Sequence, residues 1–192
     1  MMNTSYIGEN LGVYIDPVTR QAWNVKYLDA KERLAHMITS KDGYFFDANG
    51  KKVDSEFDAD SLHFEDSLIV INKNKEILVL FKEERGRFHH STLSAGENVI
   101  FAGTATFSDG KLRSLSDQSG HYKPDPLQFM VALRTLHLMG VDLSQTRIEG
   151  NFPQKIFATP SMTPTEVKEN LGPLFEDRPL SLNDIKSLIW RP

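Results

Sequence analysis

Two short stretches concentrate the side chains that can carry chemistry. Residues 86–96 read GRFHHSTLSAG, and residues 119–124 read SGHYKP. Imidazole, hydroxyl and phenol groups act as general acids and bases, and as hydrogen-bond donors to anions. The same groups also stabilise folds when they are buried and hydrogen-bonded to one another. The sequence leaves both interpretations open. Either the two stretches line a site, or they are polar staples, meaning buried polar residues whose hydrogen bonds hold parts of the fold together.

Each stretch has a feature suited to anions. The first is predicted to be a polar loop before a strand, with His89, Ser91, Thr92 and Gly96 offering donors and backbone N–H groups. It matches no known phosphate-loop spacing. The second leads into a helix N-terminus, which attracts negative charge, and Gly120 permits a tight turn that projects His121 and Tyr122.

Two more specific chemistries receive less support. Ser91, His121 and Asp125 contain the residue types of a hydrolase triad, but no G-x-S-x-G motif is present. His89, His90 and His121 lack the H-x-x-x-H or H-E-x-x-H spacing of metal sites. No metal is therefore expected.

Composition narrows the class of protein. The 192 residues carry a net charge of -4 and contain no cysteine, so nucleic acid is not expected as a partner and thiolate chemistry is excluded. No apolar run reaches the roughly 18 residues of a membrane span, and the N-terminus does not resemble a secretory signal peptide. We expect a cytoplasmic protein, or one exported from a bacterium into a host cell without such a signal.

The chain is predicted to be α+β, with a mixed, mostly antiparallel sheet and a few packed helices. A helix is expected over 24–36 with Asp29 as a cap, and another over 125–140, which begins with Asp-Pro and ends at Gly140. Hairpins are expected over 66–81 and 98–117, and Gly103 indicates a bulge or a close backbone approach. The predicted domains are a 1–25 arm, a 26–150 core and a 151–192 proline-rich helical tail packed on the core.

The motifs resemble a known family. FHHSTLSAG is similar to the FHHSSFLAG of plant IQ-motif-containing calmodulin-binding proteins, and SGHYKP is similar to their SGHY-x-P. Upstream, Tyr27, Leu28, Glu32 and Arg33 fall on that family's fixed letters, so the resemblance covers roughly residues 26–149. The sequence has no I/V-Q-x-x-x-R motif, and calmodulin binding is therefore not expected.

The same motif pair resembles stretches of bacterial and fungal proteins that look like secreted effectors or toxins. The resemblance to these effector-like proteins implies an ADP-ribosyltransferase-like enzyme that consumes NAD and modifies a host or partner protein. The implied catalytic residues are His90, Ser91, His121, Tyr122 and Glu32, with Glu97 as a second candidate acid. The implied NAD-binding residues are Arg33, His89, Thr92, Gly96 and Gly120. The alternative is a non-enzymatic protein-binding domain.

Overall fold

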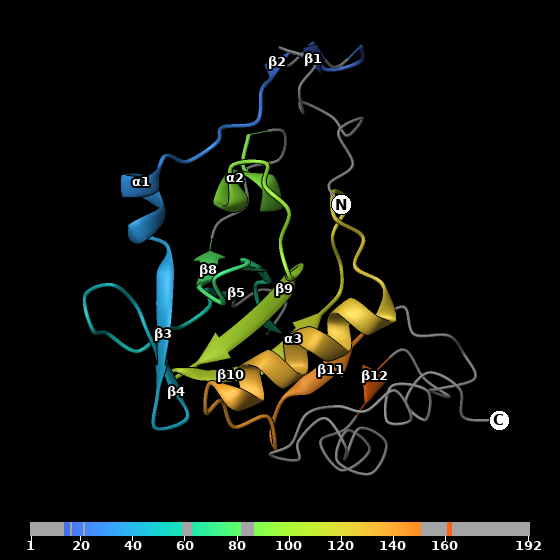
Figure 1. Ribbon diagram of the computed structural model, residues 1–192. Helices are drawn as coiled ribbons and strands as arrows, with labels where there is room; N and C mark the ends of the chain where they lie inside the picture. Colours follow the sequence, from blue (N-terminus) through green and yellow to red (C-terminus); the bar gives the residue numbers. More distant parts are fainter. Residues whose placement is uncertain are drawn as a thin grey trace, which may run out of the picture.

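The computed structural model describes residues 14–15, 17–20, 22–58, 63–81, 87–150 and 161–162 (Figure 1). The helices are α1 (Ala30–Leu34), α2 (His90–Ser94) and α3 (Pro126–Leu138). The first six strands are β1 (Tyr14–Ile15), β2 (Ala22–Trp23), β3 (Met37–Lys41), β4 (Tyr44–Phe46), β5 (Phe57–Asp58) and β6 (His63–Phe64). The others are β7 (Ser67–Ile71), β8 (Ile77–Leu80), β9 (Phe101–Ser108), β10 (Lys111–Ser116), β11 (Arg147–Glu149) and β12 (Ser161–Met162).

Within these residues, eight strands form one sheet in the order β12-β11-β10-β9-β7-β8-β3-β4. Its paired strands run antiparallel apart from β10 and β11, which are parallel. The parallel pair follows from α3, which lies between these strands in the chain and carries it back across the sheet. The predicted α+β class with a mixed, mostly antiparallel sheet is confirmed.

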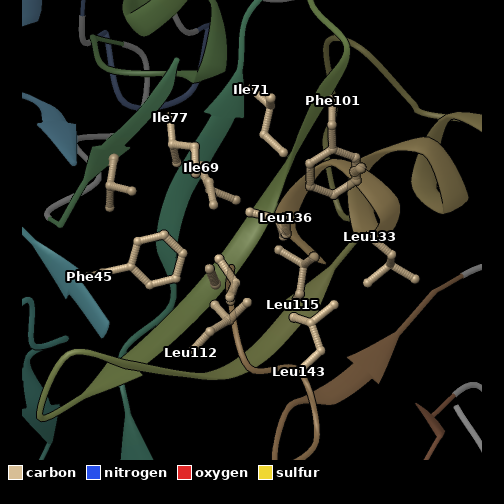
Figure 2. Packing of buried hydrophobic residues seen from close by; sticks show 14 of the residues in the cluster. Phe45, Ile69, Ile71, Ile77, Phe101, Leu112, Leu115, Leu133, Leu136 and Leu143 are labelled. Carbon is tan, nitrogen blue, oxygen red and sulfur yellow. The ribbon is translucent and has the colours of Figure 1, made fainter. Parts of the chain in front are cut away.

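The β7–β8 hairpin is buried on both faces, as its uninterrupted apolar runs predicted. Alternate residues point to opposite sides, so Ile69 and Ile71 join one core cluster while Leu68 and Val70 join another. The larger cluster lies between the sheet and α3, where Leu133 packs among side chains of the strands (Figure 2). The smaller cluster contains Leu93 of α2, so α2 and α3 lie on opposite faces of this sheet.

The sheet curls until β4 and the segment after it meet the β9–β10 hairpin. Phe45 N–H donates to the Gly110 carbonyl at 2.7 Å, and Ser55 N–H donates to the Phe107 carbonyl at 3.0 Å. The Phe45 and Phe107 rings meet edge-on, with their centroids 5.5 Å apart. This curl encloses the larger apolar cluster.

The two helices that were predicted begin at the predicted caps. The Asp29 carboxylate accepts the Glu32 N–H at 2.8 Å, and the Asp125 carboxylate accepts the Gln128 N–H at 2.7 Å. The first helix is shorter than the expected 24–36. Its predicted first half is not helical, because Lys26 and Leu28 donate their N–H groups to the carbonyls of Arg87 and Thr92.

The end of the sheet is formed by a strand that was not predicted. β12 pairs antiparallel with β11, with Met162 opposite Ile148. Apart from Ser161 and Met162, the expected helical tail over 151–192 lies outside the described residues. The division into 1–25, 26–150 and 151–192 stays a prediction.

Candidate functional site

The first motif forms a short buried helix rather than the predicted loop. The His89 N–H donates to Thr92 Oγ1 at 3.0 Å and begins α2, and all five residues of that helix are buried. Ala95 then adopts a left-handed backbone with φ of 50°, and Gly96 follows with φ of 77°. The Gly96 N–H donates to the Ser91 carbonyl at 3.0 Å, which ends the helix. The sequence did not predict this helix end, because the left-handed position at 95 is occupied by alanine instead of the usual glycine.

The second motif packs directly against the first. The rings of His89 and His121 lie 4.7 Å apart between centroids. Ser119 Oγ lies 3.3 Å from His90 Nδ1, and Ser94 Oγ lies 2.5 Å from the Tyr122 hydroxyl. Four of the candidate site residues (His89, His90, His121, Tyr122) are therefore brought together with Ser94 and Ser119 into one buried polar cluster, called here the motif cluster.

His90 is the centre of the motif cluster. Its Nε2 lies 2.7 Å from the Gly103 carbonyl, which only accepts, so Nε2 carries the hydrogen. A neutral ring then accepts at Nδ1, and the Ser119 hydroxyl donates to it while itself accepting the Tyr122 N–H at 3.2 Å. Both ring nitrogens of His90 are thus engaged within the fold.

The electrostatics agree with a neutral ring. Burial lowers the pKa of His90 from 6.5 to about 4, opposed by the Gly103 carbonyl and assisted by the neighbouring His121 and His89. A histidine with such a pKa does not carry positive charge near neutral pH. It is therefore poorly suited to holding a pyrophosphate by charge.

The Tyr122 phenol is also engaged inside the protein. Its hydroxyl donates to the Glu97 carbonyl at 2.8 Å and accepts from Ser94, and only 7% of the residue is exposed. Tyr122 belongs to the smaller apolar cluster, together with Leu93 and Ala102. The expected stacking of this ring on a nicotinamide is not what its packing provides.

Glu32, the predicted catalytic acid, contacts other residues. Its carboxylate accepts from the Asp29 N–H at 3.0 Å and from Lys26 Nζ at 2.5 Å, at the surface of α1. The Lys26 ammonium beside it, with the Asp29 N–H, holds the pKa of the Glu32 carboxyl below its usual range. A capping carboxylate paired with lysine stabilises a helix start, and it is not directed at the motif cluster.

Three further predicted residues have mixed placements. Arg33 of α1 donates to the Leu28 carbonyl at 3.3 Å. Thr92 is fully buried within α2. Gly120 lies in the turn before His121. In the described part of the chain, no group of three or more His, Asp or Glu side chains is arranged to hold a metal ion.

A cavity of about 310 Å³ lies beside the motif cluster, between α1, the β7–β8 turn and the end of α2. Its polar lining residues are Arg33, Asn72, Asn74, Glu76, Ser94, Glu97 and Asn98. Its apolar lining residues are Ala30, Leu34, Met37, Leu78, Leu93 and Val99. The motifs did not reveal this cavity, because its lining comes from segments that are distant in sequence and have ordinary compositions.

The motif cluster forms one wall of this cavity. Ser94 lines the cavity and bonds to Tyr122, and Glu97 lines it while its carbonyl accepts from Tyr122. Arg33, a predicted NAD-binding residue, lines the same cavity as Glu97 and Ser94. The motif cluster therefore borders the cavity through Ser94, while its histidines are not among the lining residues.

Comparison with known proteins places the chain in a family. A family model described as the IQ motif-containing protein middle domain matches residues 32–129, about half of the chain and including both motifs. The chain belongs to this family. The resemblance seen in FHHSTLSAG and SGHYKP is thereby confirmed, and the matched residues run from within α1 to the first turn of α3.

Relatives from Arabidopsis thaliana agree. The IQ domain-containing protein IQM2 is 29% identical over 124 residues, which is 65% of this chain and 20% of the relative. The IQ domain-containing protein IQM5 is 25% identical over 145 residues, 74% of this chain and 28% of the relative. The chain thus spans less than a third of the length of these relatives. No solved structure matches the chain.

These findings overturn the enzymatic interpretation. The relatives are plant IQ domain-containing proteins, so the expectation of an effector or toxin with ADP-ribosyltransferase activity is wrong. The structure supplies a physical reason, because His90 and Tyr122 are buried and hydrogen-bonded to the carbonyls of Gly103 and Glu97, and the Glu32 carboxylate accepts from Asp29 at the start of α1. NAD as a co-substrate rested on that interpretation alone. Ligand contact by the candidate site residues stays a prediction of the sequence.

The family also bears on partners. The expectation that calmodulin is not a partner is not confirmed, since the chain belongs to a family of IQ motif-containing proteins. In the part of the chain that the structure covers, no helix is long and apolar enough to cross a membrane.

Proposed function

We propose that this chain is a protein-binding domain, and that it docks its partner at the cavity between α1, the β7–β8 turn and α2. The observation that carries the proposal is the combination of an apolar floor, a polar rim and an exposed apolar side chain at one place. Such a combination is typical of a surface that receives a side chain from another protein.

The floor and rim have distinct chemistry. The partly buried side chains of Met37 and Val99 supply apolar surface in the floor, where they pack on Leu78 and Leu93, which are almost fully buried. At the rim, Leu34 of α1 is 59% exposed although it is a large apolar residue. Covering Leu34 and filling the cavity together removes apolar surface from water, which favours association.

The volume favours a partner side chain over a large cofactor. About 310 Å³ is at the lower limit of ordinary small-molecule sites and matches one or two protruding side chains. The rim carries both signs of charge, from Arg33, Glu76 and Glu97, and amides from Asn74 and Asn98. Mixed polar groups around an apolar centre are the arrangement expected of a protein interface.

The motif cluster supports this role by holding the cavity wall in place. α2 is too short to be stable alone, so its position depends on the bonds from His90 to Gly103 and from Ser94 to Tyr122. Rigid positioning lowers the entropy cost of binding. The two sequence motifs then serve binding indirectly, as polar staples.

Calmodulin is the first defined partner to test, because the relatives carry IQ domains by name. The chain itself has no I/V-Q-x-x-x-R motif, so contact with calmodulin would be made through another surface such as the cavity. Other protein partners fit the same geometry.

The experiment compares two aspartate substitutions at equally exposed apolar residues. Leu34→Asp changes the cavity rim at 59% exposure, and Ile15→Asp changes the β1–β2 hairpin at 58% exposure. Binding of immobilised full-length chain to calmodulin, with and without Ca²⁺, and to proteins of a eukaryotic lysate is then measured. We expect Leu34→Asp to weaken the dominant interaction about tenfold or more and Ile15→Asp to leave it unchanged. Equal binding by both variants would exclude the cavity as the docking surface.

A further inference from the structure

The charged residues around the cavity favour one kind of partner side chain. Among the described residues that line the cavity, Glu76, Glu97 and Arg33 are the charged ones. Two carboxylates and one guanidinium give this lining a formal charge of -1 at neutral pH. An excess of carboxylate attracts a cationic group and repels an anionic one, so the lining selects by charge as well as by shape.

Arg33 is already engaged within the protein. Its Nη1 donates to the Leu28 carbonyl at 3.3 Å, in a bond that is partly buried. Leu28 packs in the smaller apolar cluster, so this bond ties the guanidinium to the chain just before α1. An anion that entered the cavity would have only the remaining N–H groups of Arg33 to bind, and it would also meet two carboxylates.

The turn between β7 and β8 holds Glu76 in place. The side-chain carbonyl of Asn72 accepts the N–H groups of Asn74 and Glu76, each at 2.9 Å. The amide nitrogen of the same Asn72 side chain donates to Glu76 Oε2 at 2.6 Å. Among the described residues, no donor bonds to the other oxygen, Glu76 Oε1. The turn thus fixes a carboxylate that still has one oxygen for a donor from a partner, and such fixed positioning lowers the entropy cost of binding.

Glu97 combines a fixed backbone with an unengaged carboxylate. Its N–H donates to the Ser94 carbonyl at 3.0 Å, and its carbonyl accepts from the Tyr122 hydroxyl at 2.8 Å. The side chain is exposed, and within the described part of the chain its carboxylate has no hydrogen bond or ion pair. Glu97 therefore brings negative charge to the cavity without a cation of its own.

The apolar part of the lining suits the stem of a long basic side chain. Met37 and Val99 are half-buried, and Leu34 is exposed at the rim. Lysine and arginine pack their aliphatic stems on apolar surface of this kind while the charged end stays in contact with water and polar groups. The cavity therefore offers a surface for the stem and carboxylates for the charged end.

We propose that the cavity receives a lysine or arginine side chain of the partner protein. Its aliphatic stem packs on Met37 and Val99, and its charged end binds the carboxylates of Glu76 and Glu97. This inference rests on the function proposed above, since it names the side chain that the docking surface takes.

Blocked single residues test the choice of side chain. The N-acetyl methylamides of arginine, lysine, norleucine and glutamate are titrated into the full-length chain at constant ionic strength. The NMR shifts of the backbone amides of Asn74, Glu76, Glu97 and Asn98 are followed. Norleucine matches the aliphatic stem without the charge. We expect arginine, lysine or both to bind with a Kd about threefold to tenfold below that of norleucine, and glutamate to bind more weakly than norleucine.

The probes separate this inference from the function on which it rests. Norleucine that binds as tightly as both cationic probes, or glutamate that binds more tightly than them, would overturn the cationic side chain while the cavity remains a docking surface. The absence of any shift would also overturn it. The docking function itself fails only if the Leu34→Asp and Ile15→Asp variants bind protein partners equally.

Charge variants test the sign of the effect. Glu97→Gln should weaken binding of the tighter cationic probe about threefold, and Glu76→Gln/Glu97→Gln about tenfold. Arg33→Gln should instead tighten it, because this change removes a repelling charge. Glu56→Gln alters an exposed carboxylate outside the lining and should have no effect.

The norleucine probe serves as the control for folding in these variants, since removal of a charge should not change its affinity. Equal binding of the cationic probe by Glu97→Gln and Glu56→Gln would contradict the proposal. Weaker binding of that probe by Arg33→Gln, with norleucine unchanged, would contradict it as well.

Discussion

His90 Nε2 donates to the carbonyl oxygen of Gly103 at 2.7 Å, which ties the helix of the first motif to the middle of β9. Both partners are buried, so loss of the imidazole leaves a carbonyl without this donor and away from water. His90→Ala is therefore expected to lower the free energy of unfolding by about 1–3 kcal/mol. His90→Gln, whose amide nitrogen can donate from a similar position, should lose less. Urea denaturation of the three proteins measures this, and an unchanged midpoint for His90→Ala would contradict it.

The histidine also predicts a pH dependence. Since burial lowers the pKa of His90 from 6.5 to about 4, the unfolded chain binds a proton more readily than the folded one between these values. Stability should then fall as the pH drops from about 6.5 to 4, by roughly 3 kcal/mol from this group. Denaturation across that range, with His90→Gln as the control that lacks the titrating ring, measures the effect. The slope should be shallower in the variant, and parallel curves would assign it to other groups.

Gly103 is required by close backbone approach. A Cβ built there lies 2.0 Å from the Ser116 carbonyl oxygen and 2.7 Å from the Phe101 ring, so Gly103→Ala forces β9 and β10 apart. We expect a loss of about 3 kcal/mol or more. Gly50→Ala is the control: its φ is 77°, but its added Cβ meets nothing within 4 Å, so a loss of only about 1 kcal/mol is expected. Thermal unfolding that ranks the two variants the other way would refute the steric argument.

The Ser94–Tyr122 bond is expected to couple the two motifs energetically. Ser94→Ala and Tyr122→Phe each remove one hydroxyl from a pair 2.5 Å apart. Each should lower the free energy of unfolding by about 1 kcal/mol, and the double variant should lose less than the sum. A double-mutant cycle by urea denaturation measures that coupling. Strict additivity would mean that the hydroxyls contribute independently, for example through the separate bond from Tyr122 to the Glu97 carbonyl.

Much of the fold could be predicted from local sequence. The apolar runs of β7 and β8 predicted strands buried on both faces, and Asp125-Pro126 marked the start of α3, because these signals act over a few residues. The close approach at Gly103 was indicated by a glycine inside a strand. Residues 24–28 were predicted wrongly because their backbone pairs with Arg87 and Thr92, a contact that no local pattern records.

The site was less predictable than the fold. The types of His90 and Tyr122 indicated polar chemistry, but residue type alone does not distinguish an exposed group from a buried one, and tertiary packing buried both. The cavity was missed because Leu34, Asn74 and Asn98 come from three separate elements and have no shared motif. The sequence therefore indicated the buried polar residues of the motif cluster, but it did not indicate the cavity that they border.

We propose that the motif cluster holds the domain together while the adjacent cavity binds a protein partner. The most direct test measures unfolding midpoint and partner affinity side by side in His90→Ala and Leu34→Asp, at a temperature where both are folded. We expect His90→Ala to unfold more easily yet bind within about threefold of the natural protein, and Leu34→Asp to unfold normally yet bind about tenfold or more weakly. Normal stability with lost binding in His90→Ala would contradict the account, because it would make the histidine a contact residue.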